Sequence, residues 1–159
     1  MCADPDLPEG FELRRIRPGD GKALAQFYRG LSAESRKKLT PLGLRIDRPT
    51  CEFICFDNFL AGADKYDLIL LRDGQVVGWC FLWGVHGPRP AVGLAVAEAF
   101  QRQGLGRRML AVLLEWARRQ QLPGLYLTVE RDNDAARRLY ESFGFTAEAE
   151  SGPASHYCE

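Results

Sequence analysis

Residues 101–110, QRQGLGRRML, constrain this chain more than any other stretch, because they place two glycines and three arginines between an apolar run and a helix-like run. A helix N-terminus leaves about four backbone N–H groups unpaired and carries roughly half a positive charge. Gly104 and Gly106 have no side chain, so an anion can approach those N–H groups closely. The segment therefore predicts a phosphate or pyrophosphate site. A tight turn that uses only the conformational freedom of glycine is the alternative.

Two familiar phosphate-binding motifs do not fit these residues. A P-loop needs Lys and then Ser or Thr directly after its last glycine, whereas Arg107 and Arg108 follow Gly106. A dinucleotide-binding fingerprint needs a third glycine at the position that Met109 occupies. The anion site predicted here therefore belongs to another class.

The hydrophobic pattern along the chain predicts alternating strands and helices. Asp73 and Gly74 supply the turn of a hairpin, and the prolines and glycine of 40–50 favour a loop. Strands are expected at 11–17, 66–71, 76–84, 91–97, 125–130, 145–150 and 154–159, and helices at 22–31, 32–39, 51–60, 104–121 and from Asp132 or Asn133 to Phe143. This order indicates a mixed sheet with helices on its faces, with 91–130 forming a right-handed parallel crossover.

Composition excludes several classes of protein. The 159 residues suit one domain, and 21 basic residues balance 21 acidic ones, so no basic excess indicates a nucleic-acid partner. No apolar run approaches a membrane span, and the first residues do not resemble a secretory signal. The five cysteines are irregularly spaced, and only His86 and His156 accompany them, so we expect free thiols, no metal and a cytoplasmic location.

Two motifs together carry a family resemblance. LAVAEAFQRQGLGRRML contains Gln101, Gly104 and Gly106 after an apolar strand, and DNDAARRLYESFGF follows with Asn133 and Tyr140. Over about 91–146 the chain resembles the acetyl-CoA-binding core of the GNAT superfamily of N-acetyltransferases. The resemblance implies an α/β (α+β) fold, with a GNAT-like mixed central sheet of about seven strands flanked by about four helices.

The resemblance also implies roles for individual residues. The turn at 102–107 would hold the pyrophosphate of coenzyme A, the edge of the 91–97 strand would pair with the pantetheine arm, and Asn133 would contact that arm or cap its helix. Tyr140 would be the general acid, although it also falls on the buried face of its helix. The implied cofactor-binding residues are Leu94, Val96, Gln101, Arg102, Gln103, Gly104, Leu105, Gly106, Arg107 and Asn133.

The general base is less well defined by the sequence. Some family members that acetylate protein N-termini carry Glu five residues before the Asn, where this chain has Thr128. Tyr126, Thr128 and Glu130 share one face of their strand, which makes Glu130 a candidate base, and Glu98 is another. A solvated carboxylate at a strand end is the alternative for both.

We therefore expect one acetyltransferase domain over 1–159, with its cofactor core at about 91–146 and its acceptor side at about 20–65 and 146–159. The expected reaction moves an acetyl group from acetyl-CoA to a primary amine of a protein, peptide or small molecule, without a covalent enzyme intermediate. Another acyl-CoA, or a non-catalytic acyl-CoA-binding module, are the alternatives. The expected partner is the amine acceptor, without nucleic acid or membrane, and the protein is expected to be a monomer or homodimer.

Overall fold

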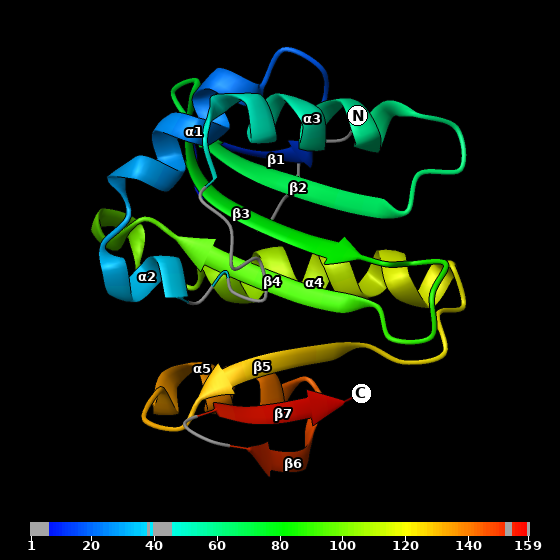
Figure 1. Cartoon of the computed structure of the whole chain (residues 1–159). Coiled ribbons are helices and arrows are strands. Elements are labelled where there is room, and N and C mark those ends of the chain that lie inside the picture. Colours follow the sequence, from blue (N-terminus) through cyan, green and yellow to red (C-terminus); the bar gives the residue numbers. More distant parts are fainter. Residues whose placement is uncertain (1–6, 38, 40–45, 152–153, 159) are drawn as a thin grey trace.

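The computed structural model describes residues 7–37, 39, 46–151 and 154–158, and these form one seven-stranded mixed sheet with helices on both faces (Figure 1). The strand order is β1-β2-β3-β4-β5-β7-β6. The strands are β1 (Phe11–Arg15), β2 (Lys65–Arg72), β3 (Gln75–Trp83), β4 (Ala91–Val96), β5 (Tyr126–Glu130), β6 (Thr146–Ser151) and β7 (Ala154–Cys158). The helices are α1 (Gly21–Gly30), α2 (Ala33–Lys37), α3 (Arg48–Phe59), the short 3-10 helix η1 (Glu98–Phe100), α4 (Leu105–Arg119) and α5 (Asp134–Ser142).

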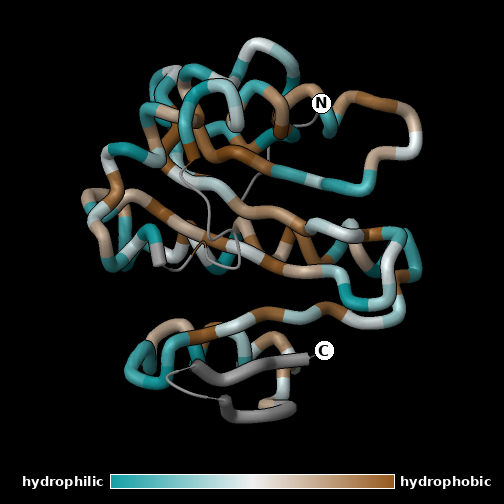
Figure 2. Tube along the Cα trace, viewed as in Figure 1, coloured by the Kyte–Doolittle hydropathy of each residue, from teal (hydrophilic) through white to brown (hydrophobic). Residues whose placement is uncertain are grey.

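Two hydrophobic clusters lie on opposite faces of the sheet. One joins α4 and α5 to the sheet and contains Met109 and Tyr140, and the other joins α1 and α3 to it and contains Trp79 and Phe81. Figure 2 shows hydrophobic residues concentrated along β2, β3 and β4. These central strands are buried on both faces, which explains why their sequences are almost continuously apolar.

The expected fold class is confirmed, and most elements end within two residues of their expected bounds. The described residues contain five α-helices rather than about four. The expectation of a loop through 40–50 is wrong at its end, because α3 begins at Arg48 after the capping residue Asp47. Pro49 favoured a loop, but it lies in the first helical turn, where a missing N–H costs nothing. Residues 40–45 lie outside the described part of the chain.

The connection between β4 and β5 is the feature of the sheet that positions the site. The two strands are parallel, as expected for the crossover, but their recorded pairing is limited to Ala91 with Tyr126. Beyond that pair they diverge, and Figure 1 shows β5, β6 and β7 separated from the first four strands. The edge of β4 that faces β5 therefore has no strand partner over most of its length.

No helix of the described residues is long and apolar enough to cross a membrane. The three cysteines whose side chains are described, Cys51, Cys55 and Cys80, are buried and free. Within the described residues, no group of three or more His, Cys, Asp or Glu side chains is arranged to hold a metal ion.

Candidate functional site

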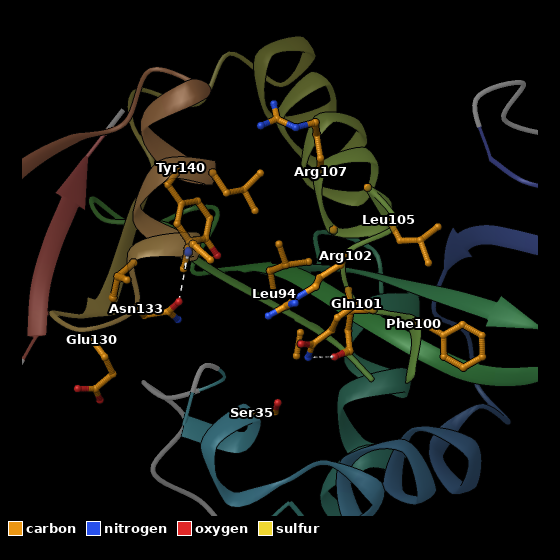
Figure 3. Close-up of a pocket in the computed structure, with 18 of the residues that line it drawn as sticks. Ser35, Leu94, Phe100, Gln101, Arg102, Leu105, Arg107, Glu130, Asn133 and Tyr140 are labelled. Atoms are coloured by element: carbon orange, nitrogen blue, oxygen red, sulfur yellow. Dashed lines mark hydrogen bonds between the residues drawn. The ribbon is translucent and has the colours of Figure 1, made fainter. Parts of the chain in front are cut away.

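A cavity of about 500 Å³ lies where β4 and β5 diverge (Figure 3). Its walls come from the C-terminal halves of these two strands, from the turn and first residues of α4, from one side of α5 and from α2. The described residues that line it are Ser35, Leu94, Ala95, Val96, Phe100, Gln101, Arg102, Gly104, Leu105, Gly106, Arg107, Thr128, Val129, Glu130, Asn133, Ala135, Ala136, Leu139 and Tyr140. The structure thus brings almost all the expected site residues to one cavity.

The glycine turn forms the basic end of this cavity. Gly104 is the N-cap residue of α4 with φ 77°, in the left-handed region that favours glycine, and Arg102 has φ 63°. The first backbone hydrogen bond of the helix is donated by Arg108 N to Gly104 O. The N–H groups that precede Arg108 in α4 are therefore available to a ligand. Exposed Arg102 and Arg107 add positive charge beside them. This combination suits an anion such as a pyrophosphate.

Gly106 leaves space beside the same turn. A Cβ atom added there would lie 3.7 Å from Val96 Cγ2 and 3.8 Å from Leu94 Cδ2, which are ordinary van der Waals contacts. The fold therefore does not require glycine at this position. Because Gly106 lines the cavity, the space that its missing side chain leaves is available to a ligand.

The free edge of β4 forms the next wall. Ala97 N bonds to Val77 O on β3, so by the alternation of an antiparallel ladder the odd-numbered residues of β4 point their backbone groups at β3. The backbone groups of Leu94 and Val96 then point towards the gap. The Gln101 side chain donates a 2.9 Å hydrogen bond to Val96 O, so it holds the end of the strand in place. An extended ligand can pair with the remaining groups as an added strand would.

Asn133 caps α5 at the far side of the cavity. Its Oδ1 accepts a 3.2 Å hydrogen bond from Ala136 N, and the residue lines the cavity (Figure 3). The expected capping role is therefore confirmed, and contact with a cofactor stays a prediction. Gln103 is exposed and is absent from the described lining, whereas buried Leu105 contributes apolar surface.

Tyr140 projects from α5 into the cavity between α4 and β4 (Figure 3). The residue is 7% exposed, and its ring meets Phe145 edge-on with centroids 5.6 Å apart. Burial raises the pKa of the phenol above its usual value, so the hydroxyl keeps its proton throughout the neutral range. Tyr140 thus has both expected properties, a packed ring and a protonated hydroxyl group at the cavity wall.

The two candidate bases lie in different environments. Glu98 Oε1 accepts hydrogen bonds from Ser32 N at 3.0 Å and Ser35 Oγ at 2.7 Å. The Ser32 side chain, the Ser35 hydroxyl and the Ser32 N–H together lower the pKa of Glu98 to about 2, which does not suit a group that must accept a proton from an amine. Glu130 is half-buried at the rim of the cavity, and Figure 3 shows its carboxylate away from Tyr140.

Ser35 is the lining residue that sequence reasoning missed. It lies on α2, which Ser32 caps: Ser32 Oγ accepts a 3.1 Å hydrogen bond from Ser35 N. Nothing local in the sequence links α2 to the turn after β4, because the two segments are more than sixty residues apart. The remaining lining residues outside the expected set are Thr128 on β5, Phe100 on η1 and apolar residues of β4, β5 and α5.

The fold and the cavity share these features with one class of protein: a mixed sheet that opens beside a helix N-terminus, a glycine turn suited to an anion and a strand edge without a partner. The model of the acetyltransferase (GNAT) family matches residues 27–145. The chain therefore belongs to this family.

Comparisons with individual proteins agree with this assignment. The chain is 30% identical to a mycothiol acetyltransferase of Streptomyces griseus over 91% of its own length and 46% of that protein. It is 34% identical to the ribosomal protein bS18-alanine N-acetyltransferase of Escherichia coli over 48% of its length and 51% of that protein. It thus spans about half the length of these relatives.

Solved structures share the fold at low sequence identity. The PaiA N-acetyltransferase of Thermoplasma acidophilum, solved with coenzyme A, has a TM-score of 0.76 and 15% identity, with 94% of this chain and 98% of that chain covered. The ribosomal-protein-S5-alanine acetyltransferase of Vibrio fischeri has a TM-score of 0.78 and 14% identity, with 96% and 94% covered.

Proposed function

We propose that this protein transfers an acetyl group from acetyl-CoA to a primary amine by direct attack. The observation that carries the proposal is the single cavity that combines a glycine turn, the free edge of β4 and the Tyr140 hydroxyl group. These are the three groups that an acyl-CoA donor needs: an anion site, a partner for its extended arm and a proton donor for its sulfur. The expected cytoplasmic location also stays a prediction.

The donor would lie along the gap between β4 and β5. Its pyrophosphate would meet the N–H groups at the start of α4, with Arg102 and Arg107 beside it. Its arm would pair with the backbone groups of Leu94 and Val96. The Val96 N–H would then face the thioester oxygen, where negative charge develops as the amine attacks.

The chemical step forms an N–C bond and breaks a C–S bond. The departing thiolate would take the proton of Tyr140, whose hydroxyl is protonated at neutral pH. The amine must lose a proton before it attacks, and Glu130 at the cavity rim and solvent water are the two routes.

The acceptor is proposed to be an amine of a peptide, protein or small molecule. The names of the two relatives, a mycothiol and a ribosomal-protein alanine acetyltransferase, include both kinds of acceptor. Thr128 stands where some members that acetylate protein N-termini carry a glutamate, which weighs against a protein N-terminus as the acceptor.

An acetyl-CoA turnover assay that detects the free thiol tests the proposal directly. Wild-type protein is assayed with peptides of defined N-termini, polyamines, amino acids and aminoglycosides. We expect thiol release that depends on one of these classes. Binding of acetyl-CoA without release of thiol by any of them would identify a binding module instead, and faster turnover with a longer acyl-CoA would correct the donor.

A further inference from the structure

Ser35 stands apart from the other groups that line the cavity. Every other lining residue among the described ones comes from 94–140, the part of the chain that forms the proposed donor site. Ser35 comes instead from α2, which Figure 1 shows next to the C-terminal end of β4. Ser35 therefore forms a wall that faces the donor from the acceptor side.

The orientation of the Ser35 hydroxyl proton follows from its partner. Ser35 Oγ lies 2.7 Å from Glu98 Oε1, and an ionised carboxylate can only accept a hydrogen bond, so Ser35 must donate its proton to Glu98. Because the pKa of Glu98 is lowered to about 2, the carboxylate is ionised at any pH where an amine reacts. A serine hydroxyl has one proton and two lone pairs. The Ser35 oxygen can therefore accept a hydrogen bond from a ligand in the cavity, but it has no proton left to donate to one.

From this geometry, and on the basis of the proposed function, we propose that Ser35 Oγ accepts a hydrogen bond from an N–H group of the amine substrate, with Glu98 as the positioning residue behind it. Glu98 also accepts from Ser32 N at 3.0 Å, so the same carboxylate holds the start of α2 against the turn after β4. The substrate class is a protonatable primary amine, whose N–H groups need acceptors.

The charges around the cavity are consistent with an amine substrate that donates a hydrogen bond to Ser35. Arg102 and Arg107 line the end where α4 begins, whereas the negative Glu98 lies behind Ser35 and Glu130 lies at the rim. An anionic donor and a cationic acceptor would therefore be attracted to different ends of the same cavity. An acidic acceptor does not fit this distribution of charge.

The test is a comparison of Michaelis constants for the two substrates. Ser35→Ala removes the acceptor oxygen but keeps a good helix former in α2. We expect the KM of the amine to rise by about tenfold or more, as for a lost hydrogen bond to a charged group, with the KM of acetyl-CoA changed by less than about twofold. Alanine amide, spermidine and benzylamine are the amine probes.

Ser32→Ala is the comparison variant, because it removes the hydroxyl that caps α2 and that also interacts with Glu98, but leaves the Ser32 N–H bond to Glu98 and the Ser35 oxygen. It should lower thermal stability as much as Ser35→Ala or more, and raise the amine KM by less than Ser35→Ala does. Glu98→Ala should raise the amine KM, and Glu98→Gln, whose side-chain oxygen can still accept both hydrogen bonds, should restore part of it.

An unchanged amine KM in Ser35→Ala, or an equal rise in both Michaelis constants, would overturn the role of Ser35 while leaving the proposed function intact. A wild-type protein that binds acetyl-CoA but releases no thiol with these three probes or with any of the peptides, polyamines, amino acids and aminoglycosides named above would overturn the proposed function and this inference together.

Discussion

At the scale of single residues, Tyr140 illustrates how one side chain can serve packing and chemistry. Its ring belongs to the core under α5, and its hydroxyl group reaches the cavity. A phenol that burial keeps protonated can supply a proton to a departing thiolate, and the same burial means that removing the ring would damage the fold. Only a substitution that keeps the ring separates the two roles.

Tyr140→Phe makes that separation. The variant keeps nearly the whole side-chain volume, so its melting temperature and its stabilisation by acetyl-CoA should match those of the wild type. Turnover should fall by about 10²-fold, because the leaving thiolate has lost its proton donor. Thermal melts with and without acetyl-CoA, together with a thiol-release assay, measure both effects. Full activity in Tyr140→Phe would show that Tyr140 is not the general acid.

Glu130→Gln tests the remaining candidate base. We expect turnover to change by less than about threefold at every pH, because the half-buried carboxylate lies at the rim of the cavity away from Tyr140 (Figure 3). The measurement is a pH–rate profile of both proteins. A loss of roughly 10²-fold that shrinks as pH rises and free amine accumulates would instead assign the base to Glu130.

At the scale of elements, the start of α4 is where backbone geometry serves binding. Gly104 has a positive φ that favours glycine, whereas Gly106 does not, and a side chain added at Gly106 would meet only ordinary van der Waals contacts. The two glycines therefore allow different tests. A change at Gly104 strains the turn, and a change at Gly106 places atoms in the space of the ligand.

Gly106→Val should abolish or sharply reduce the rise in melting temperature that acetyl-CoA produces, because its branched side chain occupies the space beside the α4 N–H groups. Gly104→Ala should lower stability by about 1 kcal/mol through its left-handed backbone. Gly84→Ala is the matched control for that strain, because Gly84 has φ 72°, open space around it and no place in the cavity lining. Equal ligand shifts in Gly106→Val and the wild type would place the pyrophosphate elsewhere.

At the scale of the whole molecule, a buried carboxylate on β2 links stability to pH. Asp67 is fully buried and accepts hydrogen bonds from Trp79 Nε1 at 2.8 Å, Trp83 Nε1 at 3.0 Å and Asn58 Nδ2 at 2.8 Å. Burial outweighs these bonds and raises the pKa of Asp67 to about 6 from an ordinary 3.8. The group joins α3 to the centre of the sheet on the face away from α4.

We expect Asp67 to make the fold less stable as pH rises. Between about pH 4 and 6 the unfolded chain has released this proton and the folded protein still holds it, so the free energy of unfolding falls with increasing pH, by about 3 kcal/mol from this group. Other carboxylates with lowered pKa values act in the opposite direction at lower pH. Asp67→Asn removes only the contribution of Asp67 to the pH dependence of the free energy of unfolding.

Denaturant unfolding at pH 4, 5, 6 and 7 measures this difference. The stability of Asp67→Asn relative to wild type should increase from pH 4 to 6 and then stay level. The fluorescence of wild-type protein should titrate near pH 6, because two indoles donate to this carboxylate. A pH-independent difference between the two proteins would show that Asp67 does not titrate in this range.

The sequence by itself determined the parts of this protein that depend on short-range interactions. Periodicity identified the strands and α4, Asp73 and Gly74 identified the hairpin turn, and Asn133 was recognised as a cap. The two family motifs identified most of the cavity wall, because each motif forms one strand–turn–helix or helix segment whose residues stay together in space.

Only the tertiary structure decided what depends on long-range packing. The divergence of β4 and β5, the position of β7 between β5 and β6, and the buried position of Asp67 arise from contacts that no local pattern encodes. Glu98 is the sharpest case, since its charge alone made it a candidate base. Hydrogen bonds from Ser32 and Ser35, far away in the chain, lower its pKa and tie it to α2 instead. The physical reason is that the properties of an ionisable group are set by its neighbours in space.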